Sequence, residues 1–187
     1  MYKKNNQINI IKNTHGAIIV EFVFVIFIMT IFIKTLISVS NYYSNVGKLD
    51  RISYSLAGIV RERARLYNND YILTQEQVNQ IKQLADNMLL NSGNPVHNLA
   101  INIETLHFNQ TESSAVTSKS IDNTKSLSFN VGTCEPNRPL NELAQLSTFS
   151  NAGRWIPLYQ VTLCLSSAPG SGTLFAPIKS SSITIER

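Results

Sequence analysis

One continuous apolar run dominates the N-terminal part of the chain. Residues 17–39 read AIIVEFVFVIFIMTIFIKTLISV, and between Phe22 and Ile33 only Thr30 is not strongly apolar. At about 1.5 Å per residue, a helix of this length reaches about 34 Å, enough for the roughly 30 Å hydrocarbon core of a bilayer. The run has no polar face, which excludes a helix lying on the membrane surface. The pattern therefore predicts a transmembrane helix over residues 17–39.

From Ser40 to Tyr67 the apolar residues recur at helical spacing instead. The predicted apolar stripe consists of Val46, Leu49, Ile52 or Ser53, Leu56, and Ile59 or Val60, with Arg63 in the place of a further apolar residue. Gly47 and Gly58 weaken this helix by about 1 kcal/mol each relative to Ala. Near its end the chain carries three alternating arginines that we expect to be solvated: Arg61, Arg63 and Arg65. Residues 40–67 are thus predicted to be an amphipathic extension of the first helix.

A second helix is predicted after Asn68-Asn69-Asp70. Thr74 and Gln77 have the spacing of a capping box, and Gly93 followed by Pro95 ends the helical pattern. The expected core stripe of this helix is Val78, Ile81, Leu84 or Ala85, and Met88.

Beyond Asn94 the apolar period changes from that of a helix to two, which indicates strands. The predicted strands are 99–103 and 106–108 with a break at Glu104, then 127–131, 159–165 and 182–186. Residues 109–125 are rich in Ser, Thr and Asn and are expected to form a mobile loop, and 140–146 is a short helical candidate. Two helices followed by short strands predict an α+β domain with a small antiparallel sheet over residues 68–187.

The formal net charge of +4 is unevenly distributed. Lys3, Lys4 and Lys12 contribute +3 to residues 1–16, which contain no acid, so the remainder carries only +1. No concentrated basic face for phosphates is evident, and we expect no nucleic-acid partner. A basic segment before an apolar helix predicts a cytoplasmic leader, residues 1–16, and export of the bulk of the chain.

The two cysteines, Cys134 and Cys164, belong to no CxxC pair or Cys/His cluster with zinc spacing, because the histidines are scattered. In an exported domain we expect them to form a disulfide, closing a loop of 30 residues and contributing roughly 3 kcal/mol. The alternative is a pair of buried free thiols.

Glu21 is an anomaly in the apolar run. A carboxylate inside a membrane helix costs on the order of 2.5–3.5 kcal/mol near the centre and less near the edge, and is usually retained for a partner. If the chain is cut after Gly16, Ala17 becomes a free amino terminus four residues before Glu21 on the same helix face. Such an ammonium, on the same or a neighbouring subunit, could neutralise the carboxylate.

The segment GAIIVEF, Gly16 to Phe22, resembles the prepilin signal of type IV pilins, and its Glu21-Phe22 pair resembles the TadE/TadF-like minor pilins (pseudopilins) of the tight adherence (Tad/Flp) pilus. The segment ISYSLAGIVRERARLY, Ile52 to Tyr67, resembles the TadF branch. The resemblance implies a pilin-like fold and cleavage between Gly16 and Ala17 by a membrane prepilin peptidase. It further implies that Glu21, followed by Phe22, sets the assembly register by pairing with a neighbouring subunit's amino terminus.

These observations favour a non-catalytic minor pilin that aids assembly or priming of a Tad-type pilus for adherence. Its partners would be the membrane, the prepilin peptidase and other pilin subunits, with the N-terminus cytoplasmic and the C-terminal domain periplasmic at the bacterial inner membrane. No Gly-rich phosphate loop or GxSxG elbow occurs, so we expect no enzyme activity, cofactor, metal or small-molecule substrate.

Three alternatives stay open. One is a binding or sensor protein exported behind an uncleaved single-pass anchor. Another is a secreted protein whose signal peptide is cut after Ser40, and the third is an anchored envelope enzyme.

Overall fold

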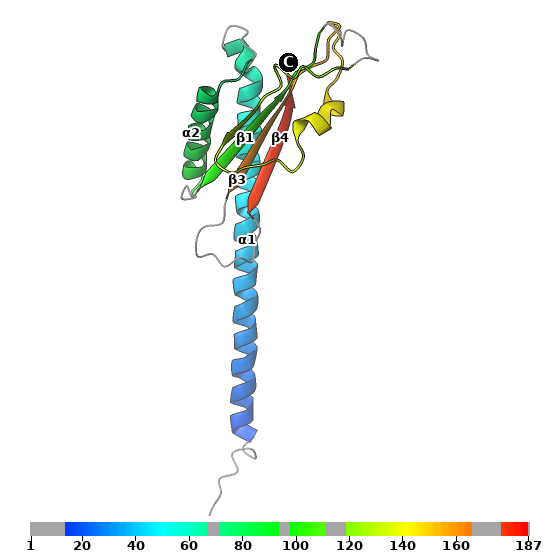
Figure 1. The fold of residues 1–187 in the computed structure, drawn as a ribbon. Helices are drawn as coiled ribbons and strands as arrows, with labels where there is room; N and C mark the ends of the chain where they lie inside the picture. The colour runs from blue at the N-terminus through cyan, green and yellow to red at the C-terminus, as the bar shows by residue number, and fades with distance from the viewer. Residues whose placement is uncertain (1–13, 67–71, 94–97, 111–118, 166–176, 187) are drawn as a thin grey trace, which may run out of the picture. The chain divides into compact units, whose positions relative to one another are not determined.

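The computed structural model describes residues 14–66, 72–93, 98–110, 119–165 and 177–186, with only the helical backbone described for 14–17 and 64–66. Its elements in chain order are α1 (Thr14–Leu66), α2 (Gln75–Asn91), β1 (Leu99–Leu106), β2 (Ser128–Val131), η2 (Leu140–Leu146, a 3₁₀ helix), β3 (Leu158–Leu165) and β4 (Ile178–Ile185) (Figure 1). The chain divides into two units, Met1–Tyr43 and Ser44–Arg187, and the boundary falls inside α1. The predicted α+β, pilin-like fold with a long apolar N-terminal helix is confirmed.

In the second unit, the C-terminal part of α1 buries one face against the domain. Its fully or nearly fully buried side chains are Leu49, Ile52, Ser53, Leu56, Ala57, Val60 and Arg63. This is the predicted stripe from Leu49 on, with Val60 rather than Ile59 on the buried side, whereas Val46 is only partly buried. Arg63 is only 6% exposed, so the expectation of a solvated arginine is wrong at this position. Its guanidinium Nη2 donates a hydrogen bond to the carbonyl of Ile72, which satisfies part of the buried charge.

Helix α2 begins as its sequence predicts. The Thr74 side chain accepts a hydrogen bond from the Gln77 amide, and the Gln77 side chain accepts one from the Thr74 amide, which completes the capping box. The helix buries Val78, Ile81, Ala85 and Leu89 against the same core as α1. Of the two residues left open by the pattern, Ala85 is buried and Leu84 is 39% exposed, while Met88 is only partly buried.

The four strands form one antiparallel sheet in the order β2-β1-β3-β4. In the two central strands, β1 and β3, the side chains that alternate toward α1 and α2 are largely apolar, including Ile101, Ile103, Val161 and Leu163. A row on the opposite face is polar and runs across all four strands through Asn130, Asn102, Thr162 and Ser181. Asn102 donates to Asn130 over 2.7 Å, and the hydroxyls of Thr162 and Ser181 are 2.9 Å apart. Asn102 and Thr162 are buried, and these hydrogen bonds satisfy part of their polar groups, whereas Asn130 and Ser181 on the outer strands are exposed.

The segment that follows β2 is held against this polar face. The predicted disulfide Cys134–Cys164 joins it to β3, with a Cα–Cα distance of 5.5 Å. Further along, Gln160 Nε2 donates to the carbonyl of Arg138 over 3.3 Å, and the Leu140 amide donates to Glu104 Oε2 over 2.7 Å. Helix η2 then packs with Leu140 on Leu106 and Leu158. The sheet therefore lies between two helices on one face and this segment on the other (Figure 1).

Two strand predictions need correction. The expected break at Glu104 is wrong, because β1 continues through it and the Glu104 carboxylate points into a hydrogen bond with η2. The last strand begins at Ile178 rather than 182, since Ser180 is buried and shares a 2.8 Å hydrogen bond with Ser53 of α1. In the predicted 109–125 loop, residues 111–118 lie outside the described residues, and Ile121 forms an isolated bridge with Phe108.

Candidate functional site

The first unit of the chain is a helical segment whose apolar side chains face outward. From Ile18 to Ile37 every large apolar side chain is exposed, from 37% for Ile28 to 69% for Val20. An exposed apolar surface of this extent needs lipid or another protein to cover it. Among the described residues, α1 is the one helix long and apolar enough to cross a membrane.

Hydroxyl groups within this segment are satisfied by the helix itself. Thr30 donates to the carbonyl of Phe27 over 2.7 Å, Thr35 to Ile31 over 2.9 Å and Ser38 to Lys34 over 2.9 Å. Such hydrogen bonds to the preceding turn remove the need for an outside partner. The polar residues of the predicted span are therefore compatible with an apolar surrounding, with the two charged residues as exceptions.

Glu21 has no such internal partner. Its side chain is exposed and makes no hydrogen bond or ion pair with any described residue. Phe22 beside it is 65% exposed. The Gly16–Ala17 peptide lies in the first turn of α1, which begins at Thr14, and Glu21 follows Ala17 by four residues, one helical turn. The structure thus presents a carboxylate that no described group of its own chain neutralises.

An aromatic pair that the sequence reading overlooked follows the apolar run. Tyr42 and Tyr43 meet edge to face with ring centroids 5.7 Å apart, and Tyr43 is 67% exposed. Tyrosines concentrate at membrane–water interfaces, where the ring is apolar and the hydroxyl is hydrated. Two tyrosines placed three residues beyond the run could have been noticed as the marker of its outer end.

In the second unit, Ser44–Arg187, His107 is buried at the end of β1. Its ring meets Tyr159 edge to face at 5.9 Å. Burial and, to a smaller extent, the positive charge of Lys125 together lower the pKa of His107 from 6.5 to about 4. His107 is therefore neutral at physiological pH and has a packing role, whereas His97 lies outside the described residues.

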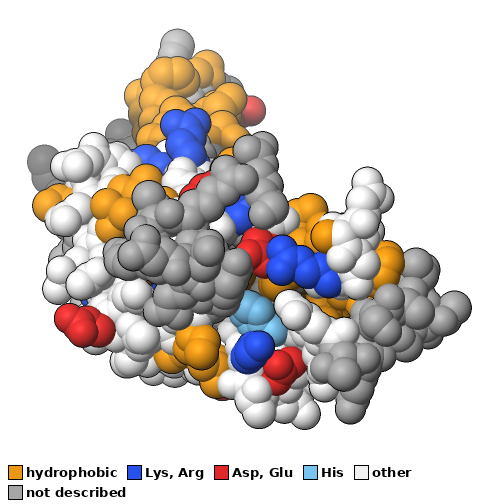
Figure 2. Space-filling model, turned by 90° about the horizontal axis from the view of Figure 1, so that it is seen from above, with side chains coloured by type: hydrophobic (Ala, Val, Ile, Leu, Met, Phe, Trp, Pro, Cys, Tyr) orange, Lys and Arg blue, Asp and Glu red, His pale blue; other side chains and the backbone are white. Residues whose placement is uncertain are grey.

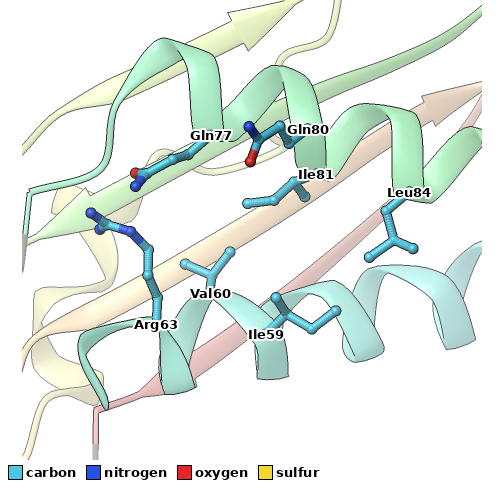
Figure 3. A pocket seen from close by; sticks show the side chains of 7 residues that line it. All are labelled: Ile59, Val60, Arg63, Gln77, Gln80, Ile81 and Leu84. Atoms are coloured by element: carbon cyan, nitrogen blue, oxygen red, sulfur yellow. The ribbon is translucent and has the colours of Figure 1, made fainter. Parts of the chain in front are cut away.

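A shallow, mainly apolar groove of about 180 Å³ lies between α1 and α2 (Figure 3). Ile59 projects into it from α1 and Leu84 from α2, while Arg63 extends from α1 toward Gln77 at one end. Its lining holds no acid, thiol, hydroxyl or histidine. The groove therefore offers shape and apolar surface but no group for covalent or acid–base chemistry.

Charged side chains do not gather into a site of one sign on the face seen in Figure 2, where acidic and basic groups lie interspersed. Within the described part of the chain, no three His, Cys, Asp or Glu side chains come together as metal ligands. The described ion pairs are short-range in sequence, for example Lys82–Asp86 at 2.6 Å.

Comparison with known proteins gives one result that identifies the chain. The sequence model of the TadF family, described as "Putative tight adherence pilin protein F", matches residues 9–187. Searches of curated proteins and of solved structures found no match. The match covers the apolar helix and the whole second unit, and it confirms the resemblance seen at GAIIVEF and at Ile52 to Tyr67. The chain belongs to the TadF family of tight adherence pilin proteins.

Proposed function

We propose that this protein is a minor pilin, or pseudopilin, that aids the assembly or priming of a Tad-type pilus for adherence. Membership in the TadF family implies a structural, non-catalytic protein in a pilus or membrane setting. In this role α1 inserts among the helices of other pilin subunits, and the exported unit makes specific contacts outside the membrane.

The observation that carries the proposal is the carboxylate of Glu21. It lies in an exposed apolar helix, one turn beyond Ala17, and has no partner among the residues that the structure describes. Cleavage between Gly16 and Ala17 by a membrane prepilin peptidase would create an ammonium group at Ala17, four residues before Glu21. This ammonium could pair with the Glu21 carboxylate of a neighbouring subunit. An unpaired charge in apolar surroundings is costly, so pairing between subunits favours one register over others.

The same proposal sets the orientation in the membrane. Residues 1–16, with three lysines and no acid, lie on the cytoplasmic side of the bacterial inner membrane. Residues 17–39 span the bilayer, 40–67 continue as the amphipathic helix, and 68–187 form the periplasmic domain. The exposed Tyr42–Tyr43 pair supports an outer interface just beyond residue 39.

The test is a set of substitutions in the native host, with pili counted by electron microscopy. Glu21→Ala and the isosteric Glu21→Gln should both reduce pilus number strongly while leaving the protein in the membrane at normal level, and Glu21→Asp should retain part of it. Lys34→Ala removes the other charge of the same segment and should leave assembly near normal, since Lys34 lies close to the end of the span. Wild-type pilus number in Glu21→Gln would show that the charge does not set the register.

The runner-up is a binding or sensor protein behind an uncleaved anchor. It shares the exposed apolar helix but gives no role to Glu21 or to the Gly16–Ala17 bond. Normal pilus number in cells that lack the protein, together with an intact leader, would favour it.

A further inference from the structure

An eleven-residue repeat lies in α1. The segment YSNVGKLDR begins at Tyr43 and the segment YSLAGIVRE begins at Tyr54, so that tyrosine, serine and glycine recur at the same positions. Eleven residues make almost three helical turns, at 3.67 residues per turn. Equivalent residues of the two segments therefore lie on one face of the helix. We call the part of this face within the second unit the repeat face: Ser44, Gly47, Asp50, Arg51, Tyr54, Ser55, Gly58, Arg61 and Glu62.

The repeat face points away from the domain core. The opposite side of the same helix carries the buried Leu49, Leu56 and Val60. On the repeat face, the residues of the first segment are exposed and Tyr54 is 76% exposed, while Gly58, Arg61 and Glu62 are half-buried. An exposed tyrosine amid glycines and serines is not accounted for by packing among the described residues.

The two glycines of the repeat face are not required by the fold. A Cβ added at Gly47 or at Gly58 would meet no described atom within 4 Å, and neither residue has a positive φ. Glycine in a helix interior lowers helix propensity, so its presence needs a reason other than backbone strain. Close approach of another backbone is the usual one, as in helix pairs that meet at small residues.

The charges of the repeat face reverse between its two segments. Asp50-Arg51 of the first occupies the positions that Arg61-Glu62 holds in the second. The side chains of Asp50 and Arg51 make no hydrogen bond or ion pair with described residues. Arg61 and Glu62 pair with each other at 2.9 Å, and a carboxylate accepts more than one donor. The face is thus complementary to itself after a shift of eleven residues, whereas an unshifted parallel pair would oppose like charges.

We propose that the repeat face docks against the repeat face of a second copy of this chain, parallel to it and displaced by eleven residues, about 16 Å along the helix axis. This offset places Gly47 of one copy against Gly58 of the other. It also places Asp50 and Arg51 against the other copy's Arg61 and Glu62.

This inference rests on the proposed pilin function for the parallel direction of the helices, because both copies enter the membrane through the same end of α1. An eleven-residue offset exceeds the four-residue spacing of Ala17 and Glu21. The two contacts therefore belong to different neighbours of one subunit, as in a helical assembly with more than one kind of neighbour.

Cysteine cross-linking of the full-length chain on piliated host cells tests the offset, because two copies displaced by about 16 Å cannot both span one bilayer through residues 17–39. Two differently tagged copies, one Gly47→Cys and one Gly58→Cys, are co-expressed and mildly oxidised. Background is low because both native cysteines are joined in a disulfide. We expect the 47–58 product between the two tags to exceed the 47–47 and 58–58 products of singly mutated cells. Dominant 47–47 or 58–58 products would overturn the offset, and no product of any kind would overturn docking between copies.

Exchanging the charges of the proposed Arg51–Glu62 pair tests the contact in the same cross-linking strain. Arg51→Glu should lower the 47–58 product roughly fivefold, as expected for one exposed pair turned repulsive, and adding Glu62→Arg should restore it. Arg138→Glu reverses an exposed arginine outside α1 and should have no effect. An unchanged product in Arg51→Glu, or no recovery in the double variant, would contradict the proposed pairing.

Counting pili in these strains separates the two proposals. Loss of pili in Glu21→Gln, together with no 47–58 product in piliated cells whose Glu21 is intact, would retain the pilin function and reject the repeat face. A 47–58 product in a host whose pili do not depend on this protein would retain the repeat face and reject the proposed pilin function.

Discussion

The backbone amide of Leu140 donates a 2.7 Å hydrogen bond to the carboxylate of Glu104, a residue 36 positions earlier in the chain. Helix η2 begins after Pro139, which has no side chain able to cap it, so Glu104 on β1 supplies the acceptor from across the sheet. This contact ties the segment that covers the polar face of the sheet to β1.

Replacing Glu104 by Ala should lower the free energy of unfolding of the second unit by about 1–2 kcal/mol, because a charge-assisted hydrogen bond to a helix end is lost. The measurement is urea unfolding of the full-length protein in detergent, followed by Trp155 fluorescence. Glu142→Ala removes an exposed carboxylate from η2 itself and should change little. Equal unfolding midpoints for the two variants would refute the capping role.

Gly132→Ala should be among the single substitutions that destabilise the second unit most. Gly132 has φ +86°, and a Cβ there would lie 2.8 Å from the Cβ of Ala100. The left-handed backbone conformation disfavours any residue with a side chain, and the new Cβ would also clash with Ala100. Together these two effects should lower the free energy of unfolding by about 2–3 kcal/mol. Gly93→Ala is the matched control, since Gly93 has φ +83° but open space around it among the described atoms. Thermal unfolding should rank Gly132→Ala well below Gly93→Ala, and the reverse order would contradict the clash.

The disulfide should contribute about 3–4 kcal/mol, because it closes a 30-residue loop. The double variant Cys134→Ala/Cys164→Ala removes it without leaving a thiol. Urea unfolding with and without a reductant checks this: wild type should lose stability on reduction, and the variant should be insensitive to reductant. A wild-type protein that unfolds at the same urea concentration in both conditions would show that the bridge does not stabilise the domain.

Acid should destabilise the second unit because the buried His107 resists protonation in the folded state. The unfolded histidine takes up a proton near pH 6.5, whereas burial holds the pKa of the folded one at about 4. Between these values the unfolded state binds more protons, so the contribution of His107 is complete above pH 6.5 and falls as the pH drops toward 4, by about 3 kcal/mol in all. Unfolding free energies measured from pH 7 to pH 4 should fall less steeply in His107→Gln. If the unfolding free energies of wild type and His107→Gln fell in parallel with pH, His107 would not be the cause of the acid destabilisation.

Local sequence patterns predicted the elements whose causes are local. The capping box at Thr74 and Gln77 and the apolar stripe of α1 follow from residues within a few turns of each other, and both are present. The alternation around residues 159–165 likewise predicted β3, which begins one residue earlier. The pairing of the cysteines followed from there being only two in a domain that was expected to be exported.

The expectations that failed depended on contacts distant in sequence. Glu104 interrupts the apolar alternation because its partner is the Leu140 amide, and no neighbouring residue reveals this. The start of β4 was missed because Ser180 is polar yet buried, through its hydrogen bond with Ser53 127 residues away. Arg63 resembles a solvated arginine until Ile72 is seen to accept its hydrogen bond. At Glu21 the sequence supplied the anomaly and the structure added the absence of an internal partner among described residues.

The central claim, that α1 is the helix of a processed pilin, is tested most directly by the mass and N-terminal sequence of the protein extracted from its host's membranes. The account predicts a mature chain that begins at Ala17, and the unprocessed form should accumulate in cells without the prepilin peptidase. A chain that retains residues 1–16 in peptidase-positive cells, or one that begins at Asn41, would contradict it.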